Sequence, residues 1–294
     1  MIFLGVRALP GDPAQAMAGD EAGPEQIAAI RADLGLDEPL ITQFMLFVGN
    51  TATMDLGQST RTGQQVTDMI SQTLPVTLWL AVYAVVLATI TGIVLGMVAE
   101  RFRGKLPEFL SNGFALLMLS IPSFWLGLLG ILLFAITLGW FPASGYVSMT
   151  ADPITSIYHL TMPAIVLATA LAAVVTRQTR ASMIETMNTD YTYFAKAKGL
   201  SGPWILLKYG LRNALIVLVT ITGLQLGALI SGAVVTERIF ALPGIGSLTL
   251  DAVLARDFPV IQAVVIVITL LYVIINFVVD VLYTVINPRV RVQG

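Results

Sequence analysis

Uncharged, strongly hydrophobic runs alternate with shorter polar segments along most of the chain. Five runs are long enough, or nearly so, to cross a bilayer, and they cover residues 74–99, 109–138, 160–176, 214–236 and 259–279. A membrane-spanning helix needs about 20 largely apolar residues to cross about 30 Å of hydrocarbon. The third run is short, but its flanking residues can lengthen it. The pattern therefore predicts an all-α protein, a polytopic membrane helix bundle with five full spans.

Composition agrees with this prediction. Of the 294 residues, 56% are hydrophobic and only 12% are charged, whereas an ordinary soluble domain carries about 25% charged residues. The net charge of −2 does not favour nucleic-acid binding, and the absence of cysteine removes disulfides and thiolate metal sites. The single histidine, His159, lies at the edge of a run, where we expect a capping or interfacial residue rather than a ligand.

Small residues recur inside the runs at a spacing that suits helix packing. Gly92 and Gly96, and likewise Gly223 and Gly227, are four positions apart. This spacing lets helix backbones approach closely in lipid, where no hydrophobic force drives helices together. We expect both pairs to serve ordinary packing within the bundle.

Two prolines, Pro122 and Pro163, lie within the second and third runs. Proline removes a backbone hydrogen bond, so both should kink or interrupt their helices, and such breaks in membrane proteins often line a pathway. The amides Gln225 and Asn276 lie within the fourth and fifth runs. The candidate pathway or kink residues are therefore Pro122, Gln225 and Asn276.

Lysine and arginine in the connecting segments predict the orientation. Counted in alternate connections from the C-terminus, eleven cationic residues fall on one side and five on the other. Because cytoplasmic loops carry the excess of Lys and Arg, residues 177–213 and the C-terminus are expected in the cytoplasm, and residues 10–73 outside it. The external segment should contain a surface helix over residues 24–34, with Gly35 as its stop. Since this segment must be carried outward, we expect Met1 to lie near the end of a first span whose earlier part is missing.

The cytoplasmic segment between the third and fourth runs has the pattern of a short docking helix. Asp190 is a suitable N-cap and Gly199 a suitable left-handed terminator, which predicts about two turns over residues 191–198. Gly202 and Pro203 are expected to separate this helix from a second one over residues 204–213, with Pro203 at its first position. A two-turn helix is marginal in water by itself, so something should pack on it, and Phe194, Ala195 and Leu200 could fill a socket. The competing interpretation is a solvated loop whose lysines only fix the topology.

The same segment resembles the membrane-spanning permease subunits of bacterial ATP-binding-cassette (ABC) importers. These carry a cytoplasmic loop with Glu-Ala-Ala, a glycine further on, and an Ile-x-Leu-Pro end. Aligned on Gly199, the loop starts at residues 193–195 and ends at Tyr209, Leu211 and Arg212, and only Ala195, Gly199 and Leu211 agree literally. Blocks along almost the whole chain are similar to dipeptide, oligopeptide, nickel and glutathione permeases: "LPGDP", "LGLDEPLITQF", "DLGQS", "LGWFPASGY", "ERIFALPGIGSL", "RDFPVIQ" and "DVLYTVINPRVR".

The resemblance implies a single transmembrane permease domain over residues 1–294, in the bacterial inner membrane, whose relatives have six spanning helices. It implies a homologous second permease, two cytoplasmic ATPase subunits and an external substrate-binding protein as partners. The short helix would be the coupling helix, seated in a groove on an ATPase subunit. The implied coupling residues are Asp190, Tyr191, Tyr193, Phe194, Ala195, Lys196, Ala197, Lys198, Gly199, Leu200, Leu211 and Arg212.

Catalytic chemistry is not expected in this chain. The sequence has no G-x-x-x-x-G-K-[ST] phosphate loop, so ATP and its Mg²⁺ should be bound by partner subunits, and no cofactor or metal is expected here. The alternative class is an ion-coupled secondary transporter or channel. Such proteins place ionisable residues inside their spans, and the five runs contain none. The substrate stays open among dipeptides, oligopeptides, nickel chelates and glutathione.

Overall fold

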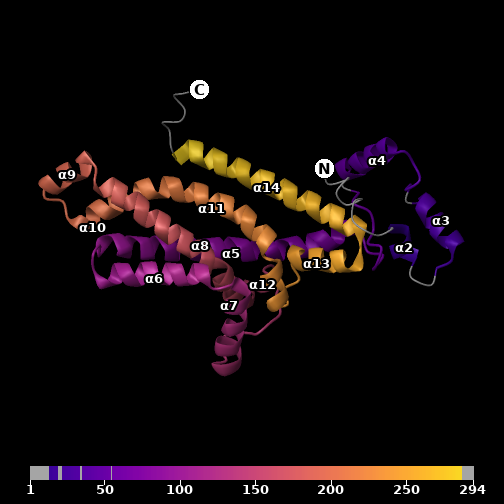
Figure 1. The fold of residues 1–294 in the computed structure, drawn as a ribbon, viewed down its shortest axis with the longest axis horizontal. Coiled ribbons are helices and arrows are strands. Elements are labelled where there is room, and N and C mark those ends of the chain that lie inside the picture. The colour runs from indigo at the N-terminus through magenta and orange to yellow at the C-terminus, as the bar shows by residue number, and fades with distance from the viewer. Residues whose placement is uncertain (1–12, 19–21, 34, 54, 287–294) are drawn as a thin grey trace. The chain divides into compact units, whose positions relative to one another are not determined.

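The computed structural model describes the chain except for residues 1–12, 19–21, 34, 54 and 287–294. Within the described ranges the ordered elements are helices, and β pairing is limited to an isolated bridge between Gln58 and Gln65. The predicted all-α fold is therefore confirmed (Figure 1). The expectation about Met1 falls on residues outside the described ranges.

Each of the five predicted runs falls on one helix or on consecutive helices. The helices are α2 (Pro13–Ala18), α3 (Pro24–Asp33), α4 (Leu40–Ala52), α5 (Val66–Arg101), α6 (Leu106–Ser120), α7 (Ser123–Gly130), η1 (Ile131–Thr137), α8 (Pro153–Met187), α9 (Asp190–Ala197), α10 (Gly202–Ile205), η2 (Leu206–Leu211), α11 (Arg212–Gly232), α12 (Val234–Ile239), α13 (Ile245–Ala255) and α14 (Phe258–Ile286). Of these described elements, α5, α8 and α14 are each long and apolar enough to cross a membrane. The number rises to five when each of two bent pairs is taken as one span.

Two proline predictions have opposite outcomes. The second run is interrupted at Pro122, which is the N-cap residue of α7, and the two halves of the run meet at 101°. Pro163, in contrast, lies inside α8, which continues from Pro153 to Met187. Of the predicted kink or interruption at Pro163, the interruption is therefore wrong. Because α8 extends well beyond the apolar run on both sides, the intact turns that flank Pro163 hold the helix together.

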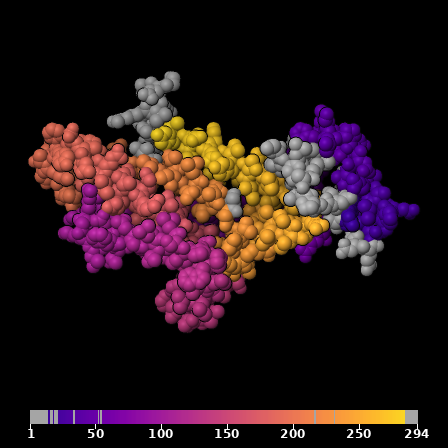
Figure 2. Space-filling view, viewed as in Figure 1, coloured from indigo at the N-terminus to yellow at the C-terminus, as the bar shows by residue number. Residues whose placement is uncertain are grey.

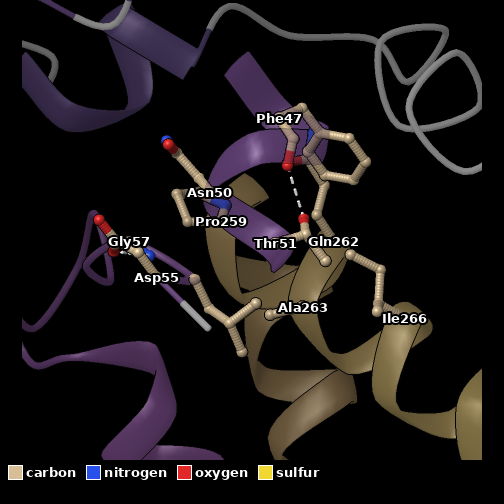
Figure 3. A pocket seen from close by; sticks show the side chains of 10 residues that line it. Phe47, Asn50, Thr51, Asp55, Gly57, Pro259, Gln262, Ala263 and Ile266 are labelled. Atoms are coloured by element: carbon tan, nitrogen blue, oxygen red, sulfur yellow. Dashed lines mark hydrogen bonds between the residues drawn. The ribbon is translucent and has the colours of Figure 1, made fainter. Parts of the chain in front are cut away.

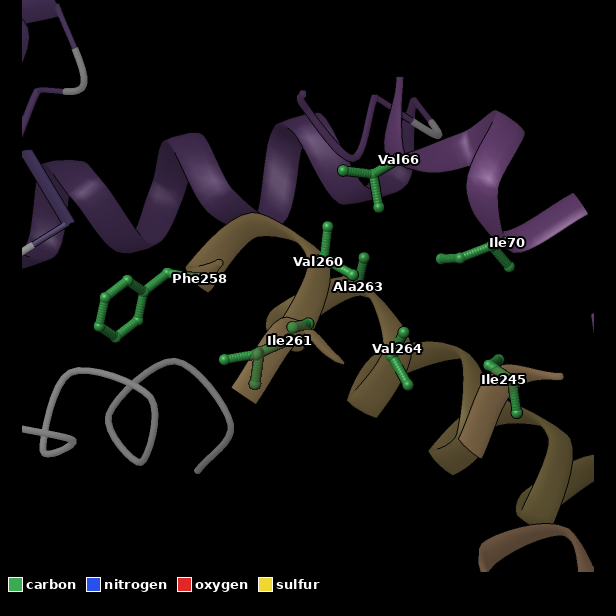
Figure 4. Packing of buried hydrophobic residues seen from close by; sticks show 9 residues of the cluster. Val66, Ile70, Ile245, Phe258, Val260, Ile261, Ala263 and Val264 are labelled. Carbon is green, nitrogen blue, oxygen red and sulfur yellow. The ribbon is translucent and has the colours of Figure 1, made fainter. Parts of the chain in front are cut away.

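By its contacts the chain divides into two compact units. The first comprises the described residues up to Thr77 together with Pro243–Leu270, and the second comprises Leu78–Leu242 with the described part of 271–294. The core of the first unit joins the start of α5 to α13 and the start of α14 (Figure 4). Its central side chains include Val66, Ile70, Ile245 and Val264. A buried hydrogen bond of 2.8 Å from the Ile245 amide to the Thr77 hydroxyl adds a polar tie.

The second unit is organised around α8. In the most apolar window of α8, 67% is buried, compared with 28% for α5 and 11% for α14. Helices α6, α7, α11 and η2 pack against it. Segment α7–η1 projects from this unit as an arm (Figures 1 and 2), and η1 has no buried residue among its seven. A helix surface this apolar and this exposed needs lipid or another membrane subunit around it.

Both glycine pairs pack as predicted. A Cβ on Gly92 would lie 2.6 Å from the Val175 side chain, and one on Gly96 would lie 2.6 Å from Thr179. These contacts bring α5 against α8. In the same way Gly223 faces Val279 and Gly227 faces the Tyr272 ring, which brings α11 against α14.

Candidate functional site

Helix α9 confirms the predicted two-turn helix but not its N-cap. The helix begins at Asp190, and the cap position is occupied by Thr189, whose φ of −89° and ψ of 154° are extended. Thr189 does not cap through its side chain, because its hydroxyl donates to the Thr186 carbonyl at 2.6 Å. Asp190 is the first helical residue, where its carboxylate complements the positive end of the helix dipole.

The other end of α9 is terminated as predicted by Gly199. Its φ is +82°, the left-handed region that glycine occupies without steric cost. The Leu200 amide donates to the Ala195 carbonyl at 3.2 Å, and the Gly199 amide donates to the Lys196 carbonyl at 2.9 Å. These two bonds form a Schellman motif, which satisfies the last carbonyls of the helix.

The inner side of α9 is fixed to the end of α8. Thr192 is fully buried, and its hydroxyl reaches the Met187 carbonyl at 2.9 Å. Ala195, one turn on, is also buried. The structure thus removes Ala195 from the exposed set predicted with Phe194 and Leu200, because at helical spacing Ala195 falls on the same face as Thr192.

The outer side of α9 is aromatic and basic. Phe194 is 70% exposed, and Tyr191 and Tyr193 are also exposed. The Lys196 ammonium lies 5.4 Å from the centre of the Tyr193 ring. Exposed aromatic side chains on a helix that is anchored from behind are well suited to fill a groove on a partner protein. Ala197, Lys198, Gly199 and Leu200 continue this exposed surface.

A polar and aromatic contact connects α9 to the start of α11. The Asn213 amide donates to the Tyr191 hydroxyl and to the Tyr209 carbonyl, at 3.0 Å each. The Tyr191 and Tyr209 rings lie 5.7 Å apart, centre to centre. Sequence reasoning assigned no role to Asn213, and only its position beside an aromatic-rich stretch could have signalled one.

Segments α10, η2 and α11 follow one another without a break, so the chain is helical from Gly202 to Gly232. Pro203 is the second helical residue rather than the first, because α10 begins at Gly202 with Ser201 as its cap. Leu211 ends η2, and Arg212 begins α11 with an exposed side chain. The π-helical turn of η2 was not predicted; turns of this kind are frequent at functional sites.

The three pathway candidates lie on separate elements of the second unit. Pro122 marks the α6–α7 break, and Gln225 is half-buried on α11. Asn276 lies on α14 between Tyr272 and Val279, the residues that face the glycines of α11, and its amide oxygen is buried. This position places Asn276 at a helix–helix interface. The structure does not bring the three residues together, and their pathway role stays a prediction.

A pocket that the sequence did not predict lies in the first unit. Its volume is about 190 Å³, and it is lined by the end of α4, the turn after it and the start of α14 (Figure 3). The polar lining comes from Asn50, Thr51, Asp55 and Gln262. In the part of the chain that the structure describes, no three His, Asp or Glu side chains are grouped so that they could hold a metal ion.

Comparison with known proteins agrees with this architecture. Residues 92–292 match the family described as binding-protein-dependent transport system inner membrane component, and residues 1–81 match the N-terminal part of such membrane components. The chain is 44% identical over 291 residues to a glutathione transport system permease protein of Escherichia coli O6:H1, covering 99% of this chain and 92% of that protein. It is 43% identical over 291 residues to a putative peptide transport system permease protein of Brucella abortus, covering 99% and 93%.

Among solved structures, an inward-facing MetNI methionine ABC transporter matches with a TM-score of 0.62. The match covers 75% of this chain and 97% of that chain at 16% sequence identity, so it supports the fold alone. The two sequence matches cover nearly the full described bundle and identify its family. The chain therefore belongs to the family of inner-membrane components of binding-protein-dependent transport systems, and it is a permease subunit of an ABC importer.

Proposed function

We propose that this permease takes its driving force from an ATPase subunit through α9, and that its cargo is a small peptide such as glutathione. The proposal for α9 rests on one observation above the others. Its outer face exposes Tyr191, Tyr193 and Phe194 while its inner face is bonded to α8. An exposed apolar face of this kind marks a contact site for a partner.

Force applied to α9 has two routes into the bundle. Through Thr192 it reaches the end of α8, the most buried helix of the second unit. Through Tyr191 and Asn213 it reaches α11, which runs on without a break from η2. When the ATPase pair closes on ATP, α9 would move as a rigid lever and tilt both helices. The bundle would then change between inward-open and outward-open arrangements, a two-state change biased by the partner.

The proposed orientation follows from the distribution of lysine and arginine. Residues 177–213 and the C-terminus would face the cytoplasm, and residues 10–73 would face outward. ATP and Mg²⁺ would be held by the two ATPase subunits, because this sequence has no phosphate loop. A homologous permease would complete the pathway, and an external binding protein would deliver the cargo. An ion-coupled transporter, the alternative class, would be expected to place ionisable residues inside its spans, and the five runs contain none.

The substrate proposal rests on two relatives, one named for glutathione transport and the other for peptide transport. Reconstituted with its partners, the transporter should accumulate radiolabelled di- or tripeptides in proteoliposomes only when ATP and the binding protein are present. Accumulation of nickel chelates without peptide uptake would overturn the substrate assignment and leave the assignment of α9 untouched.

The α9 contact can be tested by crosslinking, because the chain has no cysteine and any introduced thiol is unique. Phe194→Cys should crosslink to the ATPase subunit when a short bifunctional reagent is added to the assembled transporter. Ile154→Cys is the matched control, because Ile154 is 82% exposed at the opposite end of α8. If neither Phe194→Cys nor Tyr193→Cys gives an ATPase adduct, or if Ile154→Cys gives as much, α9 is not the contact.

A further inference from the structure

Helix α5 presents one more residue on the face that meets α8. Gly92 and Gly96 lie against Val175 and Thr179, and the next position at the same spacing is Glu100. Because residues four apart share a helix face, Glu100 points at α8 one turn beyond the glycine contacts. Arg180 follows Thr179 on α8. A carboxylate and a guanidinium are therefore brought to the end of a very close helix pair.

In this structure Arg180 pairs with a carboxylate other than that of Glu100. Its Nη2 donates to Oε1 of Glu108, which lies on α6, and the Arg180 and Glu108 side chains are 29% and 10% exposed. The other oxygen of Glu108 accepts the Gly104 amide at 2.5 Å. Glu108 thus fixes the turn between α5 and α6 and, through Arg180, holds α6 to α8.

Two buried groups of the same cluster are left unsatisfied. Among the residues that the structure describes, Oε2 of Glu100 and Nε of Arg180 have no hydrogen-bond partner, although both atoms are buried. One is an acceptor and the other a donor. Arg103, Arg180 and Lys196 act on Glu100 as positive charges and Glu108 as a negative one. Leaving buried polar atoms unpaired is costly, so a purely static cluster would be expected to pair them.

We propose that Arg180 is a positioning residue that alternates between two carboxylates, Glu108 in the arrangement described here and Glu100 in a second arrangement of the transporter. The guanidinium has five donors in a fixed fork, so it can keep its charge satisfied at either carboxylate. Pairing with Glu108 holds α6 to α8. Pairing with Glu100 instead ties Arg180 to α5 and releases α6. Such an exchange gives two discrete states instead of a continuous deformation.

The exchange predicts that removing one carboxylate and removing the other shift the equilibrium between the two arrangements in opposite directions. Glu100→Gln removes the second partner and should favour the arrangement described here. Glu108→Gln removes the present partner and should favour the other. We expect the ratio of the two populations to change by roughly 5- to 150-fold in each case, the usual range of coupling between two sites in a protein. A static structural cluster would give a loss of stability in both variants and no opposite shift.

The populations can be measured by the distance between spin labels on introduced cysteines at Leu110 of α6 and Glu185 of α8. Both positions are exposed and outside the cluster. In the assembled transporter, Glu108→Gln should increase the longer-distance population and Glu100→Gln should deplete it, with and without ATP. Glu38→Gln, an exposed carboxylate of the first unit, should change neither. If the transporter with Glu108→Gln does not assemble, Glu108→Asp should also increase the longer-distance population, by a smaller amount.

Equal distance distributions in the two variants, or shifts in the same direction, would overturn the exchange. Failure of the α9 assignment is distinguishable from this result. If α9 does not contact the ATPase, the Phe194→Cys crosslink is absent, while the opposite shifts of Glu100→Gln and Glu108→Gln persist in the absence of ATP.

Discussion

Ser59 and Asp257, which are 198 positions apart in the sequence, are joined by a buried hydrogen bond of 2.5 Å from the serine hydroxyl to the aspartate carboxylate. The other carboxylate oxygen accepts the Thr60 amide at 3.2 Å. The serine oxygen in turn accepts the Thr62 amide at 3.0 Å. One aspartate, between α13 and α14, therefore fixes the turn that precedes α5 in the first unit.

We expect Ser59→Ala to destabilise the first unit by about 1–3 kcal/mol, because it leaves part of a buried carboxylate without a donor. The measurement is the thermal unfolding midpoint of the purified protein in detergent or nanodiscs. Ser71→Ala is the control, since Ser71 is exposed and its hydroxyl bonds only within α5. Equal midpoints for the two variants would show that the Ser59–Asp257 bond carries no net stability.

A methyl group at Gly96 should separate α5 from α8. The new Cβ would lie 2.6 Å from the Thr179 side chain and 2.9 Å from the Thr176 carbonyl oxygen, and a backbone atom cannot move aside alone. We expect Gly96→Ala to cost about 1–3 kcal/mol, as overpacking usually does. Gly113→Ala on α6 is the control, because no described atom lies within 4 Å of its new Cβ. Thermal unfolding should place Gly96→Ala below the parent protein and Gly113→Ala at or above it.

A side chain at Gly199 should disturb α9 through backbone strain alone. At φ of +82° an L-residue is strained, although no described atom would contact its Cβ. We expect Gly199→Val to cost more than the roughly 1–2 kcal/mol of the left-handed conformation, because valine is β-branched. ATPase binding, measured by co-purification, should fall while membrane insertion stays normal.

Gly202→Ala serves as the control for that change, because Gly202 lies at the start of α10 and no described atom would contact its Cβ. Gly199→Asn should retain most of the binding, since asparagine tolerates the left-handed region. Normal peptide uptake by Gly199→Val would contradict the assignment of α9 as a coupling element.

Composition and spacing predicted the features that depend on a residue and its near neighbours in the sequence. A membrane span must be long and apolar, so all five runs were visible in the sequence. Close helix packing requires a missing side chain, so Gly92 and Gly96 could be assigned before their partners were known. Gly199 was recognisable because few other residues suit a left-handed helix terminator.

The features that the sequence could not predict depend on distant partners. Arg180 and Glu108 are 72 positions apart, and nothing local to either residue indicates the pair. The burial of Ala195 follows from how α9 lies on α8, and the 101° turn at Pro122 has a direction that proline alone does not set. Helix α4 is apolar but too short to register as a span.

The stability contributed by the N-cap of α8 should depend on pH. Asp152 accepts hydrogen bonds from the Thr155 hydroxyl at 2.6 Å and from the Thr155 and Ile154 amides at 3.2 and 3.1 Å. The Thr155 hydroxyl bond is the main cause that lowers the pKa of Asp152 below its ordinary value of 3.8. A lowered folded-state pKa means that the contribution is fully present above the ordinary value and is lost as the pH falls through the folded value. Asp152→Ala should therefore unfold at a lower temperature than the parent protein at pH 7, and the difference should shrink in acid.

We expect the hydrogen bond between Tyr191 and Asn213 to contribute to the coupling between α9 and α11. Tyr191→Phe keeps the ring contact with Tyr209 and removes only the hydroxyl that accepts the Asn213 amide. The loss should amount to about 0.5–1.5 kcal/mol, the usual net value of one hydrogen bond. Because this bond joins α9 to α11, we expect more ATP to be hydrolysed per molecule transported, with little change in thermal stability. Tyr158→Phe is the matched control, since it also removes one exposed hydroxyl hydrogen bond, to the Trp140 carbonyl at 2.8 Å, but near the opposite end of α8 from α9. The same ratio of hydrolysis to transport in both variants would show that α9 drives the bundle through α8 and not through α11.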